Sequence, residues 1–327
     1  MLVAATAGCG VRLDTPPPEP PTPDAAEQVR QEAALAAATL AAPRRSSAAR
    51  GADGADGATG AADEAGAADE NPGAAGADDA PAAALLEIAD DARAQEAALG
   101  GVWVAWPDGA PEGVATPPVR TAPPVADPMP SDVLTLLLDG AETAREAALS
   151  VGGDDVAAVL AAVALARQDD AVDLAAALGT EAGGVPAGEP LTVEALRRRG
   201  ADGPTVRVLD QARYALETMA ARTGGADRER AIARVAQLQA LVDAALAAGA
   251  PDDRLPAYAL DAPPEGTGLD PLAAAAAGAE RRLVEHWVFS LTLVGAEERP
   301  ALVAAAEDAA AQVRAWGGSL PALPGVA

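Results

Sequence analysis

Few side chains in this sequence have the type and spacing that metal or acid–base chemistry requires. The 327 residues include one His and one Cys. Di-iron sites in four-helix bundles take Glu from two helices and Glu-x-x-His from the other two. Here Leu283 stands three residues before His286, and Glu285 is about 100° away from His286 around a helix. Asp210, Glu280 and His286 remain as weak candidate ligands, so we predict no metal site, no cofactor and no catalytic residue.

The composition excludes further classes of function. The net charge is −26 and every basic side chain is Arg, so the field of the chain repels phosphate and we expect no nucleic acid partner. A single Cys rules out an intramolecular disulfide and a thiolate metal cluster. Nucleophile elbows, phosphate-binding Gly-rich loops and zinc-binding His-Glu-x-x-His motifs are missing from the sequence. A non-enzymatic role is therefore the first expectation.

Three clusters allow both a functional and a structural interpretation. Asp169 and Asp173 share a helix face and suit a cation, but we favour a solvated acidic patch. The triplet 197–199 (RRR) suits anionic lipid headgroups, but we favour internal salt bridges. Trp103 and Trp106 suit an aromatic ligand platform, but we favour rings that cover the end of a core.

The first residues carry a modification motif. Thr6-Ala7-Gly8-Cys9 resembles the lipobox of bacterial lipoproteins, with Thr6 where Leu is usual. This predicts a lipid on Cys9 and a cell-membrane location on the extracytoplasmic face, with the Pro-rich stretch up to residue 23 as a tether. The basic and apolar parts of a signal peptide are short, so we expect the reading frame to begin further upstream. The alternative is a fortuitous Cys near a frayed terminus.

The remaining pattern predicts an all-α chain. Alanine is abundant and is the best helix former, whereas aromatic residues make up 2% of the chain, which disfavours sheets. The expected first helix runs from Asp24 to Ala42 and ends at Pro43. The predicted divisions are a lipoprotein signal remnant and tether (1–23), an N-terminal helical bundle (24–178) with a disordered acidic insertion (43–79), a linker (179–204), a C-terminal four-helix bundle (205–318) and a tail (319–327).

The C-terminal part has the more regular pattern. Helices are expected over 205–222, 227–248, 270–295 and 297–316, joined as two hairpins by a Pro-bearing connection over 249–269. Two hairpins with one long crossover form the ferritin-like arrangement of a four-helix bundle. In the second of these helices the apolar period predicts an inward-facing row, made of Ile232, Val235, Leu238, Val242 and Leu246.

Three short segments carry a family resemblance: CGVRL over 9–13, ALGGVWV over 98–104 and PAYAL over 256–260. They resemble an actinobacterial family of alanine-rich lipoproteins with a ferritin-like domain of unknown function. The resemblance implies a lipid anchor and a ferritin-like C-terminal bundle. Because the N-terminal half repeats the order of hairpin, crossover and hairpin, we expect two tandem bundles, the first less regular. The competing layout is one irregular bundle.

Three functions are possible hypotheses for such a chain. The first is a membrane-anchored extracytoplasmic lipoprotein that acts as a non-enzymatic interaction or structural module of the cell envelope, with the membrane and an unknown protein as partners. The second is an extracytoplasmic protein that binds or stores metal through carboxylates on a degenerate ferritin-like scaffold. The third is a carrier that holds a small apolar ligand in the Ala-lined bundle interior.

Overall fold

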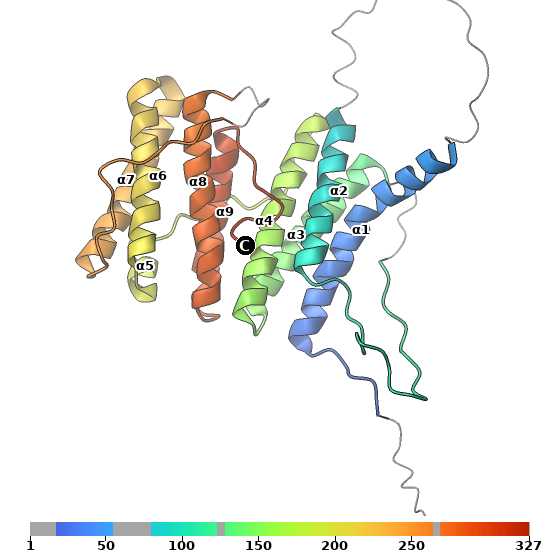
Figure 1. The fold of residues 1–327 in the computed structure, drawn as a ribbon. Coiled ribbons are helices and arrows are strands. Elements are labelled where there is room, and N and C mark those ends of the chain that lie inside the picture. Colours follow the sequence, from blue (N-terminus) through green and yellow to red (C-terminus); the bar gives the residue numbers. More distant parts are fainter. Residues whose placement is uncertain (1–17, 55–79, 123–127, 264–268, 327) are drawn as a thin grey trace, which may run out of the picture.

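The computed structural model shows an all-α protein, as predicted (Figure 1). It describes residues 18–54, 80–122, 128–263 and 269–326, except for the side chains of 42–54. Within these ranges the regular elements are nine α-helices and one short 3₁₀ helix, with no strand. They are α1 (Ala25–Gly54), α2 (Ala80–Ala98), α3 (Pro130–Ser150), α4 (Asp154–Ala177), α5 (Val193–Arg199), α6 (Gly203–Arg222), α7 (Gly225–Ala247), α8 (Pro271–Ser290), η1 (Leu291–Leu293) and α9 (Arg299–Ala315).

Polar caps fix the starts of several helices. The Asp202 side chain accepts a hydrogen bond from the Thr205 backbone N–H at 2.9 Å, at the start of α6. Asp270 does the same at the start of α8, from the N–H of Leu272 at 2.8 Å. Each cap satisfies an N–H group that has no partner inside the helix. Such caps explain why the predicted starts of these helices agree with the structure to within about two residues.

The predicted end of the first helix is wrong. Helix α1 passes through Pro43 and ends at Gly54. Proline removes one backbone hydrogen bond, but the Ala and Arg residues after it are strong helix formers, and the helix continues. The expected disordered insertion therefore does not include 43–54, and its remainder, 55–79, lies outside the described residues.

The helices pack as two groups, α1–α4 and α6–α9 (Figure 1). The main pairs within them are α1 with α2, α3 with α4, α6 with α7, and α8 with α9. Helix α4 also contacts α8, α9 and η1, and one continuous cluster of buried residues extends through both groups. The segment predicted as a linker contributes to this packing, because its helix α5 contacts α7 and buries Leu196.

The inward-facing row of α7 differs in part from the prediction. Leu238 and Val242 are buried as expected, but Ile232 is 50% exposed. Arg234, two residues further along the helix, points inward instead and is 6% exposed. The prediction for Ile232 is wrong because a charged residue occupies the interior position, which an apolar pattern cannot reveal.

No helix among the described residues is long and apolar enough to cross a bilayer. Residues 18–23, which precede α1, have no regular secondary structure and are mostly exposed. Six residues of this kind, four of them proline, form a spacer rather than a packed element.

Candidate functional site

The centre of the C-terminal group is an arginine held by two carboxylates. Arg234 of α7 donates to Glu280 of α8 through Nε, at 3.0 Å, and through Nη2, at 2.8 Å. Its Nη1 donates to Asp308 of α9 at 2.6 Å. Glu280 is fully buried. Three helices of the group therefore meet at one guanidinium.

The electrostatics of this centre favour the charged form of Arg234. Burial lowers the pKa of Arg234, but the charges of Glu280 and Asp308 and their hydrogen bonds outweigh burial and raise the pKa above its ordinary value. Burial raises the pKa of Glu280, and Arg234 opposes that rise. The interior does bring two carboxylates face to face, as a metal site requires, but a guanidinium already lies between them as the cation.

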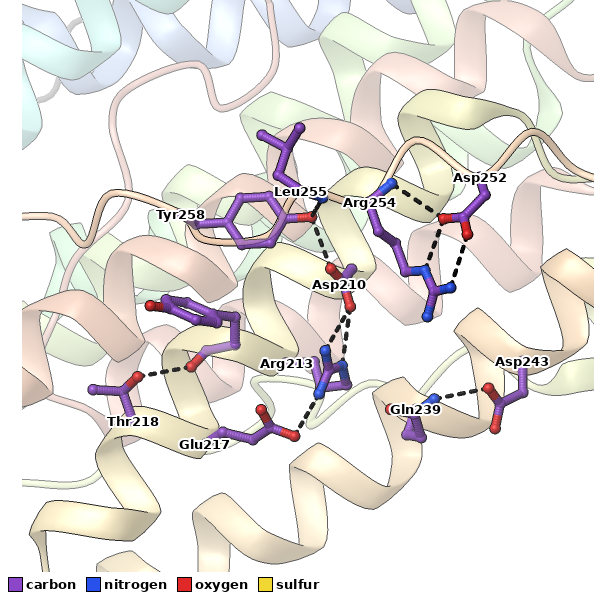
Figure 2. A network of polar contacts seen from close by, with 11 residues as sticks. Asp210, Arg213, Glu217, Thr218, Gln239, Asp243, Asp252, Arg254, Leu255 and Tyr258 are labelled. Atoms are coloured by element: carbon purple, nitrogen blue, oxygen red, sulfur yellow. Dashed lines mark hydrogen bonds and ion pairs between the residues drawn. The ribbon is translucent and has the colours of Figure 1, made fainter.

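Asp210 belongs to a different network, which fastens the crossover after α7 to helix α6 (Figure 2). The hydroxyl of Tyr258 donates to Asp210 at 2.8 Å and accepts from the Leu255 N–H at 3.0 Å. Arg213 donates to the other oxygen of Asp210 through Nη2 at 2.7 Å. Burial raises the pKa of Tyr258, and its bond to Asp210 adds to the rise. Both oxygens of this carboxylate are thus occupied by protein donors.

His286 lies in a third place, beside the start of α6. Its Nε2 is 3.1 Å from the Thr205 hydroxyl, which itself donates to Asp202. The imidazole makes an edge-to-face contact with Trp287 at 4.9 Å between centroids. Burial, with the charge of Arg199, lowers the pKa of His286 to about 4, so the ring is neutral at pH 7.

The three candidate ligands predicted from the sequence therefore sit in three separate networks. Arg234 and Asp308, which complete the network of Glu280, were not among the predicted residues. Across the described ranges, no group of three or more His, Cys, Asp or Glu side chains has the geometry to hold a metal ion.

The N-terminal group also has a buried arginine at its centre. Arg167 of α4 is 1% exposed and contacts all three other helices of its group. It donates to the Gln95 side chain of α2 at 3.0 Å and to the backbone carbonyls of Gly140 in α3, at 3.1 Å, and Ala33 in α1, at 3.3 Å. These acceptors are neutral, and burial lowers the pKa of Arg167 to about 10. The group remains charged at pH 7.

The carboxylates near the end of α4 are less solvated than predicted. Asp169 is 3% exposed and accepts from Arg314 at 3.3 Å and from the Leu320 N–H at 2.6 Å, so a solvated patch is the wrong description for it. Burial raises the pKa of Asp91 on the facing helix α2 to about 6, with repulsion from neighbouring carboxylates. Burial and repulsion from neighbouring carboxylates also raise the pKa of Asp170 well above its ordinary value.

Arginine pairs also join the two groups. Arg145 of α3 donates to the buried Glu307 of α9 at 2.6 Å. Arg299, at the start of α9, donates to Asp154 of α4 at 2.6 Å and to the carbonyl of Val151 at 2.6 Å. With Arg314 at the far end of α9, these pairs fix the second group on the first.

Two hollows lie beside α8. One, of about 620 Å³, is lined by Asp261, Arg281 and the turn 317–319. Another, of about 640 Å³, lies along His286 and Phe289, next to the C-terminal residues 321–326. Neither is lined mainly by the Ala residues of the bundle interior that the apolar-carrier hypothesis requires.

Comparison with known protein families, characterised proteins and solved structures finds no match to this chain. The function must therefore be inferred from the chain's own residues. Cys9, the predicted lipidation site, lies outside the described residues.

Proposed function

We propose that this protein is a lipoprotein anchored on the extracytoplasmic face of the cell membrane through a lipid on Cys9, where it acts as a non-enzymatic interaction or structural module of the cell envelope. Its partners are the membrane, through the lipid, and a second protein. Two features support the proposal. One is the lipobox-like motif at Cys9, and the other is an interior whose charged side chains bind one another.

One observation carries the non-enzymatic part. Arg234 occupies the space between Glu280 and Asp308, so the carboxylates best placed for metal chemistry are neutralised by the fold itself. Asp210 and His286 are likewise engaged by neighbouring residues. The alternative of carboxylate-based metal binding loses support, because each ligand would first have to give up an ion pair or hydrogen bond.

The residues after Cys9 support the anchor. The stretch from Thr15 to Pro23 contains six prolines, and its described part, 18–23, is mostly exposed and has no regular secondary structure. A Pro-rich chain is extended and holds a folded domain away from its attachment point. The acidic surface suits this picture too, since a net charge of −26 disfavours spontaneous adsorption to anionic headgroups without an anchor.

The scaffold is proposed to be ferritin-like. Its support is the order of α6 to α9 as two hairpins with one long connection between α7 and α8. The segment 256–260 (PAYAL), one of the three that resemble actinobacterial alanine-rich lipoproteins, supplies Tyr258, the residue that fastens this connection to Asp210. Membership of that family is part of the proposal.

Metabolic labelling tests the anchor. Cells that express the full reading frame are grown with an alkyne analogue of palmitate, and the protein is isolated and conjugated to a fluorophore. We expect label on the wild type and none on Cys9→Ala, which should also move from the membrane fraction to the soluble fraction. An unlabelled wild-type protein, or a Cys9→Ala variant that stays with the membrane, would refute lipidation at Cys9.

A further inference from the structure

The helices of both groups share one end, at which residues 18–23 enter α1 (Figure 1). Arg30, near the start of α1, and Asp155, at the start of α4, line one hollow of about 210 Å³. Arg299, at the start of α9, donates to Asp154 at 2.6 Å. We call this end the tether end; it comprises the start of α1, residues 98–106, residues 151–155 and residues 289–299.

The tether end exposes large apolar side chains. Phe289, the only Phe of the chain, is 53% exposed at the end of α8, and Leu293 in η1 is 63% exposed. Across the same end, Val104 is 37% exposed, and Trp103 and Trp106 on either side of it are half-buried. An end of a fold that exposes several large apolar side chains is the kind of surface that marks a contact site.

Charges of both signs border this surface. Asp154, Asp155 and Glu297 are exposed, and the exposed Arg198 lines one small hollow together with Glu297. The charges at this end therefore do not select a partner of one sign. An apolar phase with an uncharged boundary fits the side chains better, and partly exposed Trp rings favour the boundary between water and lipid.

The position of the tether indicates that the apolar phase is the lipid bilayer. About 15 residues separate Cys9 from the start of α1, a reach of roughly 50 Å when extended. A short tether of this kind gives the attached surface a local concentration in the millimolar range, at which weak contacts are populated. We infer that the tether end lies against the bilayer, with Phe289 and Leu293 inserted and Trp103 and Trp106 at headgroup level. This inference rests on the proposed lipid anchor.

The test supplies the anchor chemically, so that it does not depend on lipidation in cells. The full chain is coupled through the Cys9 thiol to maleimide lipid in phosphatidylcholine vesicles, with and without bromine on the acyl chains. Bromine quenches only Trp that approaches the acyl chains. We expect quenching of the wild type through Trp103 and Trp106, because Trp287 and Trp316 are buried at 3% and 4% exposure.

Two matched variants locate the contact. The double variant Phe289→Ser/Leu293→Ser should lose at least half of the quenching. Ile232→Ser removes an equally exposed apolar side chain from the first half of α7, towards the opposite end, and should leave quenching unchanged. Circular dichroism should show the same unfolding midpoint for the double variant and the wild type, since both replaced side chains are exposed.

Three results would overturn the inference. They are no quenching in the coupled wild type, an equal loss with Ile232→Ser, and a concentration-dependent dimer in sedimentation that disappears in the double variant, which would assign the surface to a second copy of the chain. An unlabelled Cys9 in cells refutes the anchor alone. Labelled Cys9 without vesicle quenching refutes the surface contact alone.

Discussion

Arg234 and Glu280 form a two-point ion pair between α7 and α8, with Nε–Oε1 and Nη2–Oε2 distances of 3.0 and 2.8 Å. Both side chains are buried, so water cannot take the place of either partner if the other is lost. Asp308 completes the group from α9. This buried charged contact is therefore the point at which three helices of the C-terminal group depend on one another.

Replacing one member of the Arg234–Glu280 ion pair should lower the free energy of unfolding more than replacing both. Arg234→Met leaves Glu280 buried without its partner, and we expect a loss of about 3–5 kcal/mol in the free energy of unfolding. Arg234→Met/Glu280→Leu should recover at least half of that loss. Urea unfolding followed by circular dichroism measures both. Arg198→Met, which breaks an exposed pair with Glu194, is the control and should change nothing measurable. Equal losses in the single and double variants would contradict this account.

Divalent metal should not stabilise the wild-type protein. Arg234 satisfies both Glu280 and Asp308, so a metal ion would have to displace a guanidinium. We expect the thermal unfolding midpoint to be the same with and without Mn²⁺, and metal analysis of protein purified without chelators to find no stoichiometric ion. A midpoint that rises with Mn²⁺ in the wild type but not in Glu280→Gln would restore the metal-binding alternative.

The carboxylates between α2 and α4 should make the protein more stable in mild acid. The folded-state pKa of Asp91 is about 6, above its unfolded value near 4, because of burial and repulsion from Glu87, Asp90 and Asp169. Between about pH 4 and 6 the folded state binds more protons, so this contribution to stability is present at low pH and is lost as the pH rises through 6.

Substitution isolates this effect from others. Asp91→Asn should raise the unfolding midpoint at pH 7.5, raise it by about half as much at pH 5, and leave it nearly unchanged below the unfolded pKa near 4. His286 acts in the opposite direction: its folded pKa of about 4 lies below the unfolded value near 6.5, so its contribution to stability is lost as the pH falls through that window. Midpoints measured at several pH values in a His286→Gln background separate the two. If the unfolding midpoint of Asp91→Asn fell at pH 7.5, repulsion between Asp91 and its neighbouring carboxylates would not be destabilising the wild type.

Tyr258 should hold the crossover on α6. Tyr258→Phe deletes the hydrogen bond to Asp210, and because the acceptor is charged we expect a loss of about 1.5–3 kcal/mol. Hydrogen exchange should become faster in residues 251–262 and change little in α9. Tyr214→Phe removes a neighbouring phenol hydroxyl but leaves the bonds to Asp210 in place, so it serves as the control. Unchanged exchange in the crossover of Tyr258→Phe would show that other contacts hold it.

At Gly140, in the middle of α3, replacement of glycine by alanine should lower stability instead of raising it. A Cβ at this position would lie 2.9 Å from Nη1 of Arg167, closer than side chains tolerate. Gly140→Ala, which elsewhere in a helix gains about 1 kcal/mol, should therefore destabilise the wild type. In an Arg167→Met background the same change should stabilise. A gain in both backgrounds would mean that Arg167 moves aside without cost.

The sequence predicts the helices well because their ends are marked by local signals. Asp270 caps α8 where the sequence predicts the start of a helix, and Asp202 caps α6 from within the segment predicted as a linker, whereas α1 passes its expected stop at Pro43. Such signals act within a few residues of the chain, so they can be recognised without knowledge of the fold.

The charged centres could not be predicted in the same way. Arg234 and Arg167 look like surface residues until the carboxylates and carbonyls from other helices are placed around them. Two weaker signals did exist. Gly140 interrupts a helical pattern without a turn, and Arg234 shares the helical spacing of Ala231 and Leu238, both buried. The glycine indicates that a large group lies against α3. The spacing of Arg234 indicates that its side chain points into the interior.

The way residues 18–23 enter α1 has a mechanical consequence. The segment leaves the fold at the N-terminal end of α1 (Figure 1), so a pull on it acts first on the first turns of that helix. Arg30 joins these turns to the carbonyl of Gly101, and Arg167 of α4 holds Ala33 about one turn further on. A force at the tether is therefore passed from α1 to residues 98–106 and to α4, rather than borne by one helix alone.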